Sequence, residues 1–326
     1  MILLNVVSIV ALAATVVMLL VTGQEAAIEG GQRFSQASRA AVIARGGELS
    51  AATGLMRDAV DAPETDHLQE PWAQIQDEGV KIRGGTFSLT ISDAQAKFNL
   101  NNLAEGGLAS AQSVALISTA LDLDPAQVEQ IALRIRESGL LKELSDLTAL
   151  GFPADELGRL SRFVTVLPSA TAININTAHQ ELIAAVLGSD AAAQQIVAQR
   201  ERAGFVTPED LSAIGVTNVQ GLGFTSNHFW VRTTVEIGDA RQVRTVLLRR
   251  ETSAEGHVIS AIGRWRGEAA PDASIGTPRA VERKGMSGLL DAAAVKLTLS
   301  AKLGNIRDNV PHNAPALTRR HPYIEI

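Results

Sequence analysis

Cysteine is absent from the 326-residue chain. This excludes disulfide bonds, thiolate nucleophiles, and zinc or iron–sulfur sites built from cysteine. The chain also lacks the Gly-x-Ser-x-Gly, Gly-x-x-x-x-Gly-Lys-Ser/Thr and His-Glu-x-x-His motifs. Its 6 histidines are scattered along the sequence without metal-ligand spacing. We therefore expect no enzymatic activity and assign no catalytic residue.

Charge is missing from the N-terminal region. The first charged side chain is Glu25, and the first basic one is Arg33. At about 1.5 Å per residue, 20 helical residues cover roughly 30 Å, which is the thickness of the hydrocarbon core of a bilayer. A secretory signal peptide would instead carry a basic segment before a shorter apolar run. We favour a transmembrane anchor over residues 1–24, with a signal peptide as the alternative.

A positive surface for nucleic acids is also missing. The formal net charge is −6, although the segment 269–326 carries 8 basic and 5 acidic residues. The rest of the chain is therefore more acidic than the total. An acidic body repels the phosphates of DNA and RNA, so we expect no nucleic-acid partner.

Residues 25–62 have apolar side chains at helical spacing and are rich in alanine. This pattern predicts a helix that continues out of the anchor and ends before Pro63. We interpret the acidic residues at its end, from Asp58 to Asp66, as a solvated loop. Glycines are expected to loosen the helix at Gly30, Gly31, Gly46 and Gly47.

Two segments alternate apolar and polar residues, as half-buried strands do. The first is GVKIRGGTFSLTIS, with a hairpin turn at Gly84-Gly85; the second is HFWVRTTVEIGDARQVRTVLLRR, with a turn at Gly238-Asp239, followed by HVISAIGRW. Between them, over residues 109–221, the period changes to 3.6 and no strand is expected. We favour a helical domain inserted into a small antiparallel sheet over two successive domains.

The helical block contains an internal repeat. QIALRIRESG at 130–139 resembles QIVAQRERAG at 195–204, and DLTALGF and DLSAIGV follow at offsets of 65 and 64. Each copy predicts an amphipathic helix that ends at glycine, then a short helix capped by Ser145 or Thr207. Asp124, which precedes a proline, predicts a further helix N-cap.

The second copy resembles the helix–hairpin–helix modules of competence-type DNA-binding proteins, from ININTA at 173–178 onwards. Such modules offer the backbone N–H groups of a Gly-apolar-Gly hairpin to a phosphate. Here the hairpin is Gly188-Ser189-Asp190, and the first copy carries Asp122 and Asp124. We interpret these acidic hairpins as the fold without the DNA function. A membrane-anchored DNA-binding protein remains the alternative function.

Several segments, taken in order, resemble the K-type minor pseudopilins of the bacterial type II (general) secretion pathway. The likeness covers roughly residues 1–250 and rests on the anchor, HLQEPWA, ISDAQAKFNLNNL, ININTA and SNHFWVRTTVEIG. It implies an α+β fold, in which the transmembrane helix continues into a pilin-like helix packed on a small antiparallel sheet. A large all-α domain of two helix–hairpin–helix units is inserted between strands.

The sequence pattern and the resemblance together divide the chain into five regions. The last of them, a tail beyond the part that the resemblance covers, sustains neither period, and we expect it to be weakly ordered with a short helix near 286–303. The regions are an anchor at 1–24, a pilin-like helix and first strands at 25–103, the inserted domain at 104–225, the remaining strands at 226–268 and the tail at 269–326.

The resemblance also implies roles for two N-terminal residues, Met1 and Asn5. Family members lose a short basic leader to a prepilin peptidase, so Met1 is expected to be the mature terminus and a candidate for N-methylation. Most pilins and pseudopilins have glutamate at the fifth mature position, where its carboxylate pairs with a neighbouring subunit's amino terminus. Asn5 cannot form this pair, which implies a subunit at the tip.

The implied function is to initiate and cap the pseudopilus, which supports export of folded proteins across the outer membrane. The implied partners are I-type and J-type minor pseudopilins, the major pseudopilin, the inner-membrane assembly platform and prepilin peptidase. The bulk of the chain would lie in the periplasm, behind a single pass through the inner membrane. The resemblance leaves calcium open as a cofactor. The sequence assigns no ligands, because its acidic loops do not follow the EF-hand pattern.

Overall fold

The structure is a computed structural model that describes residues 2–105, 118–119, 123–217, 220–253 and 256–267. The expected tail at 269–326 and its helix near 286–303 lie outside these residues, as do Met1 and Asp122.

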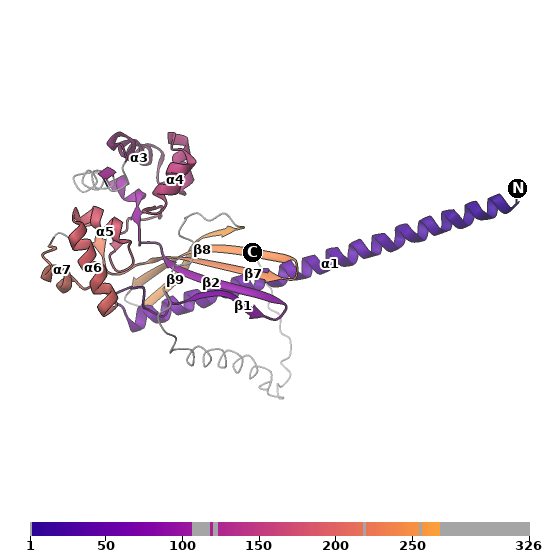
Figure 1. The fold of residues 1–326 in the computed structure, drawn as a ribbon, viewed down its shortest axis with the longest axis horizontal. Coiled ribbons are helices and arrows are strands. Elements are labelled where there is room, and N and C mark those ends of the chain that lie inside the picture. The colour runs from indigo at the N-terminus through magenta and orange to yellow at the C-terminus, as the bar shows by residue number, and fades with distance from the viewer. Residues whose placement is uncertain (1, 106–117, 120–122, 218–219, 254–255, 268–326) are drawn as a thin grey trace, which may run out of the picture. The chain divides into compact units, whose positions relative to one another are not determined.

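Helix α1 runs without interruption from Ile2 to Asp61 (Figure 1). Its N-terminal part is apolar and long enough to cross a membrane, which fits the predicted anchor. The helix ends just before Pro63, as predicted. The glycines expected to loosen it do not break it. At one of them, Gly47, an added Cβ would lie 2.7 Å from Oγ1 of Thr233, so glycine lets the helix approach the sheet closely.

The antiparallel sheet has five strands in the order β1-β2-β7-β8-β9 (Figure 1). Both predicted hairpins are present, with Ile82 opposite Gly85 and Ile237 opposite Ala240. β2 pairs with β7 along its whole length. The chain between these two strands therefore interrupts the sheet, the arrangement expected of an insertion. The bounds are β1 (Gln76–Ile82), β2 (Gly85–Asp93), β7 (His228–Ile237), β8 (Ala240–Ser253) and β9 (Gly256–Arg266).

Helix α1 packs on this sheet through small side chains. Ala40 and Ala44 contact Val235 and Ile237 of β7, while Ala51 and Leu55 belong to a second apolar cluster with β2, β7 and β8. Glu48 lies between them and pairs with Arg244 at 2.8 Å and with Arg264 at 2.7 Å. These ion pairs fix the position of α1 along two adjacent strands, β8 and β9.

Between β2 and β7 lie helices and very short strands. The strands form two parallel pairs, β3 with β4 and β5 with β6. The expectation of no strand at 109–221 is wrong for β4 and β5, because two-residue strands are too short to show alternation. The bounds are β3 (Phe98–Asn99), η1 (Leu100–Glu105), α3 (Pro125–Ser138), η2 (Leu144–Leu150), α4 (Ala154–Leu160), β4 (Val164–Thr165), β5 (Ile173–Asn174), α5 (Gln180–Leu187), α6 (Asp190–Ala203), α7 (Pro208–Ala213) and β6 (Leu222–Gly223).

The helix caps agree with the sequence in two of three places. Asp124 caps α3 by accepting from the Ala126 N–H, and Thr207 caps α7. The expected cap at Ser145 is wrong. Glu143 precedes η2 instead, and the Asp146 carboxylate accepts its backbone N–H at 3.2 Å.

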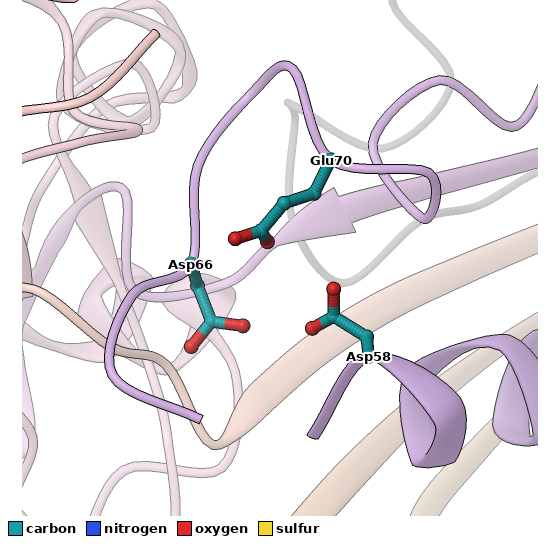
Figure 2. Close-up of side chains that lie close together, drawn as sticks. All are labelled: Asp58, Asp66 and Glu70. Carbon is teal, nitrogen blue, oxygen red and sulfur yellow. The ribbon is translucent and has the colours of Figure 1, made fainter. Parts of the chain in front are cut away.

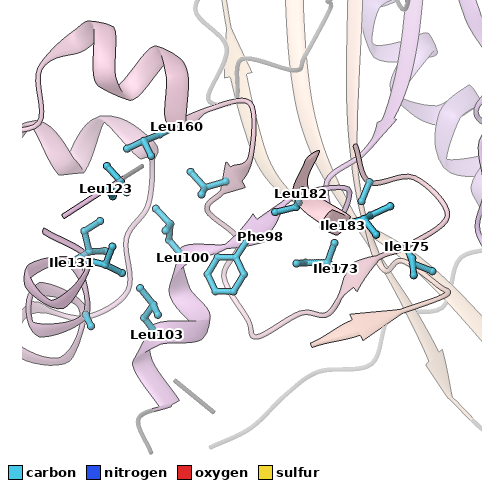
Figure 3. Packing of buried hydrophobic residues seen from close by; sticks show 14 of the residues in the cluster. Phe98, Leu100, Leu103, Leu123, Ile131, Leu160, Ile173, Ile175, Leu182 and Ile183 are labelled. Atoms are coloured by element: carbon cyan, nitrogen blue, oxygen red, sulfur yellow. The ribbon is translucent and has the colours of Figure 1, made fainter. Parts of the chain in front are cut away.

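One apolar core joins both copies of the repeat (Figure 3). Ile131 of α3 and Leu147 of η2 come from the first copy, and Ile183 of α5 and Ile196 of α6 from the second; all are at most 1% exposed. Phe98 and Leu103, which directly follow β2, belong to the same core. The helical copies therefore fold around one interior.

Candidate functional site

Three carboxylates gather where α1 ends and the chain turns back towards the sheet. Asp58 lies in the last turn of α1, and Asp66 and Glu70 lie in the segment before β1 (Figure 2). One oxygen from each lies within 4.8 Å of the others. The three residues are 6%, 0% and 4% exposed. The prediction of a solvated acidic loop is therefore wrong for Asp58 and Asp66, whereas Asp61 and Glu64 are exposed, as predicted.

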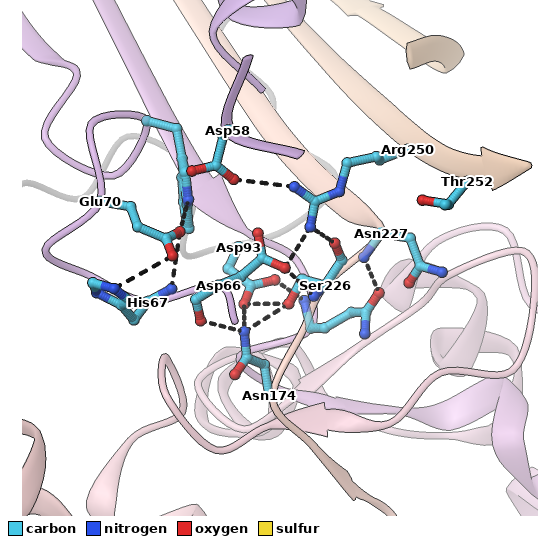
Figure 4. Close-up of polar contacts among 12 residues, drawn as sticks. Asp58, Asp66, His67, Glu70, Asp93, Asn174, Ser226, Asn227, Arg250 and Thr252 are labelled. Atoms are coloured by element: carbon cyan, nitrogen blue, oxygen red, sulfur yellow. Dashed lines mark hydrogen bonds and ion pairs between the residues drawn. The ribbon is translucent and has the colours of Figure 1, made fainter. Parts of the chain in front are cut away.

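The acids can be buried because Arg250 of β8 supplies a counter-charge. Its Nη1 lies 3.1 Å from Oδ2 of Asp58, and its Nη2 pairs with Oδ2 of Asp66 (Figure 4). The same Nη2 donates to the Ser226 carbonyl at 2.6 Å. A buried ion pair needs such additional hydrogen bonds to offset its desolvation. One guanidinium nevertheless faces three carboxyl groups.

Two further carboxyl oxygens of the cluster are buried without a hydrogen bond. Within the described part of the chain, Oδ1 of Asp66 has no hydrogen-bond partner, and Oε1 of Glu70 has only the His67 ring nitrogen Nε2 nearby, at 3.4 Å. The other oxygen of Glu70 accepts from Trp72 Nε1 at 2.5 Å and from the His67 N–H at 3.1 Å. Burial raises the pKa of Glu70 to about 8 and that of Asp66 to about 6. The cluster therefore holds more carboxyl groups than the single guanidinium of Arg250 can neutralise.

The cluster fits a divalent cation of the calcium type. Calcium takes oxygen ligands at about 2.3–2.6 Å, so ligands on opposite sides of it are roughly 4.8 Å apart. The carboxyl oxygens of Asp58, Asp66 and Glu70 lie within that span. Arg250 binds one oxygen of each aspartate and leaves the unpartnered oxygen of Asp66 available. Asp124, by contrast, uses its side chain as a helix cap.

A second polar network connects this cluster to the entry and exit of the inserted segment (Figure 4). Asp93, the last residue of β2, accepts from Asn174 Nδ2 at 3.0 Å, from Ser226 Oγ at 2.7 Å and from the Thr177 hydroxyl. Asn174 also donates to the Asp66 carbonyl at 2.9 Å. These bonds give a structural reason for the residues of the ININTA motif.

Of the residues singled out in the sequence, Asn5 lies exposed in the apolar part of α1, and Met1 is outside the described residues. The predicted hairpin is present between α5 and α6. Gly188 has a φ of +63°, and Ser189 caps α6 by accepting from the Ala192 N–H at 3.2 Å. The serine hydroxyl and the Asp190 carboxylate thus stand at the helix start, where a phosphate would bind in the DNA-binding modules.

The sequence missed Glu70 and Arg250 as partners of Asp58 and Asp66. The HLQEPWA segment contains Glu70. Its carboxylate becomes part of a cluster only when the fold brings it to Asp58 and Asp66, which Arg250 of β8 pairs with. No local pattern marks Arg250, because it is one of several arginines in its strand.

These features define a class: a membrane-anchored, pilin-like subunit whose sheet is interrupted by a helical segment. A family model described as type II secretion system (T2SS), protein K, matches residues 173–231. Type II secretion system protein K of Pseudomonas aeruginosa is 28% identical over 301 residues, covering 79% of this chain and 90% of that protein. Its namesake from Klebsiella pneumoniae is 45% identical over 64 residues, covering 20% of this chain and 19% of that protein.

The fold is shared with a solved structure. One chain of the GspK-GspI-GspJ complex from the type 2 secretion system of enterotoxigenic Escherichia coli matches with a TM-score of 0.56 and 23% identity. The match covers 74% of this chain and 99% of that one. The chain is therefore similar in sequence to K-type proteins of the type II secretion system.

Proposed function

We propose that the protein is the tip subunit of a type II secretion pseudopilus, where it starts and caps assembly without enzymatic activity. The observation that carries this proposal is the helical segment between the paired strands β2 and β7. A filament subunit must be covered by the next subunit along the axis. A large addition at the sheet is tolerated best where no subunit follows.

Asn5 supports the same position. A glutamate at the fifth position would place a carboxylate in hydrocarbon, which is costly without a partner amino group. The first subunit of a filament has no preceding subunit to supply that group, and a neutral amide avoids the cost. Met1 is proposed as the processed and methylated terminus. The inner membrane would hold α1, and the sheet and insertion would lie in the periplasm.

The proposed partners are I-type and J-type minor pseudopilins, since the similar solved chain comes from a complex with these two proteins. The experiment co-expresses the full-length chain with both partners from the same organism and extracts the membranes in mild detergent. Light scattering after size exclusion is expected to give a 1:1:1 complex. Three separate species would overturn the proposal. In the assembled case, Asn5→Glu is expected to reduce complex formation.

We also propose calcium as a bound cofactor, held by Asp58, Asp66 and Glu70. The buried oxygen of Asp66 that has no hydrogen-bond partner supports this proposal, as does the excess of carboxyl groups over the single guanidinium of Arg250. Bound calcium would supply the missing positive charge and link the end of α1 to the segment before β1.

Titration calorimetry of the chelator-treated, full-length protein with calcium chloride tests this cofactor. We expect one site in the wild-type protein, and at least tenfold weaker binding after Glu70→Gln. Asp61→Asn is the matched control, because Asp61 is an exposed acid at the end of α1, close in sequence to the cluster but not part of it. Equal binding by wild type and Glu70→Gln would contradict the assignment, as would the absence of any binding heat accompanied by an unchanged melting temperature.

A further inference from the structure

The HLQEPWA segment, which carries Glu70, also contacts the inserted helices. The ring of His67 stacks on the ring of Phe205, with the ring centroids 5.0 Å apart and an angle of 19° between the two planes. Phe205 belongs to the loop between α6 and α7, in the second copy of the repeat. The carboxylate cluster therefore borders the insertion, although none of its three acids comes from it.

A glycine allows this loop to approach the HLQEPWA segment closely. Gly204, which precedes Phe205, is buried and has a φ of +94°, a conformation that residues with a Cβ rarely adopt. A Cβ added to Gly204 would lie only 2.8 Å from Oε1 of Gln69. The loop and the segment therefore touch at two places, at His67 and at Gln69.

The ININTA motif fixes the same loop from within the insertion. The Val206 N–H donates to Oδ1 of Asn176 at 2.8 Å, and Nδ2 of Asn176 donates to the Val206 carbonyl at 3.2 Å. Both residues are buried. Because one side chain satisfies both polar backbone groups of Val206, the neighbouring ring of Phe205 is presented to His67 in a defined position.

The imidazole of His67 connects Phe205 to the carboxylate of Glu70. Its Nδ1 accepts the Gln69 N–H at 3.2 Å, so the ring hydrogen is on Nε2. Nε2 lies 3.4 Å from Oε1 of Glu70 (Figure 4). Stacking on Phe205 holds the plane of the imidazole and thereby directs this N–H towards the carboxylate.

We propose that His67 and Phe205 are positioning residues of the calcium site, so that the second copy of the repeat supports the site from outside. Phe205 orients the imidazole, and the imidazole orients Glu70 for the cation. Removing a group that orients a metal ligand typically lowers metal affinity by about 10–100-fold. Because coupling between two sites is reciprocal, bound calcium would in turn hold the loop between α6 and α7 against the HLQEPWA segment. The inference rests on the proposed calcium site.

Titration calorimetry of the full-length protein with calcium chloride tests the positioning role. Phe205→Ala is expected to weaken calcium binding about tenfold, whereas Phe205→Tyr keeps the ring and should keep the wild-type affinity. In a Glu70→Gln background, Phe205→Ala should cause no further loss, because it acts through that carboxylate. Phe34→Ala is the matched control, since Phe34 is 75% exposed on α1. Circular dichroism checks that each variant is folded.

Amide hydrogen exchange of the same protein tests the reverse direction. Compared with chelator-treated protein, saturating calcium chloride is expected to slow exchange about tenfold at residues 204–207, by the same factor as the change in affinity. The slowing should be absent in Phe205→Ala. Exchange at the β7–β8 turn, at the other end of these strands, should not respond to calcium in either protein.

The possible results separate the positioning role from the calcium site itself. Calcium binding that Phe205→Ala leaves unchanged overturns the positioning role while the calcium site stands. A loss of affinity that Phe205→Tyr shares, or that persists in the Glu70→Gln background, reflects a general effect on the fold and also overturns the role. If the wild-type protein shows no binding heat and an unchanged melting temperature, the calcium site is wrong, and this inference is wrong with it.

Discussion

The helix-and-sheet part of the molecule and its helical insertion are stabilised in different ways. Between α1 and the sheet, charged pairs accompany the apolar contacts: Glu48 binds two arginines, and Arg250 binds two aspartates. The insertion is organised around one apolar core with helix caps at its surface. Ion pairs fix one orientation of two elements, whereas apolar packing depends mainly on shape and volume.

The largest effect should follow from removing the counter-charge in the helix-and-sheet part. Arg250→Ala leaves Asp58 and Asp66 buried without their cation and is expected to lower the free energy of unfolding by about 3–5 kcal/mol. Urea denaturation measures this loss. Arg249→Ala, which breaks a partly exposed pair with Glu251, is expected to cost no more than about 1 kcal/mol. Similar losses for the two variants would contradict the comparison.

A cavity in the apolar core of the insertion should destabilise mainly the insertion and leave the helix-and-sheet part unchanged. Ile183 is fully buried in the common core, and Ile183→Ala is expected to cost about 2–5 kcal/mol. Amide hydrogen exchange should then accelerate in α5 and α6 and stay unchanged in β7 and β8. Equal acceleration of exchange in β7 and β8 would show that the sheet and the insertion unfold as one cooperative unit, which would contradict the prediction.

The junction between the two parts should respond to pH. Burial raises the pKa of Asp93 from 3.8 to about 6, so the folded protein binds this proton more tightly than the unfolded chain. Its contribution to stability therefore grows as pH falls from about 6 to about 4, by up to about 3 kcal/mol. Asp93→Asn removes this dependence. Urea denaturation of both proteins should give a wild-type advantage that is larger at pH 4.5 than at pH 7.5, and an equal advantage would refute the prediction.

The smallest effect concerns a helix cap at the surface of the insertion. Ser189→Ala removes the acceptor for the Ala192 N–H and is expected to cost about 1 kcal/mol. Thermal denaturation of the full chain would register this as a small decrease in melting temperature. An unchanged melting temperature would mean that water replaces the hydroxyl without loss.

Local signals account for the parts of the fold that the sequence predicts. The uncharged run and Pro63 locate α1, and alternation with paired turn residues locates β1, β2, β7 and β8. The insertion of a helical segment between strands follows from the resemblance and from the return of alternation after a helical stretch. Asp124 and Thr207 were recognisable as caps because a cap acts on its own helix.

The acidic cluster could not be predicted in the same way. Asp58 and Asp66 look solvated in the sequence because aspartates near a proline usually are. Their burial depends on Arg250, which the sheet brings to them from almost 200 residues away. The short strands β4 and β5 were missed for a similar reason, since each exists only through a partner distant in sequence.

The pairing of β2 with β7 also bears on how the chain folds. Asp93 lies opposite Phe229, so the sheet cannot close until most of the polypeptide has been made. Joining strand ends across an unstructured loop of this length costs about 2 kcal/mol more than across a ten-residue loop. A prefolded insertion shortens that loop to the distance between its own two ends. The helices between the strands are thus expected to fold first. Once folded, they hold the ends of β2 and β7 close together, so that these central strands can pair.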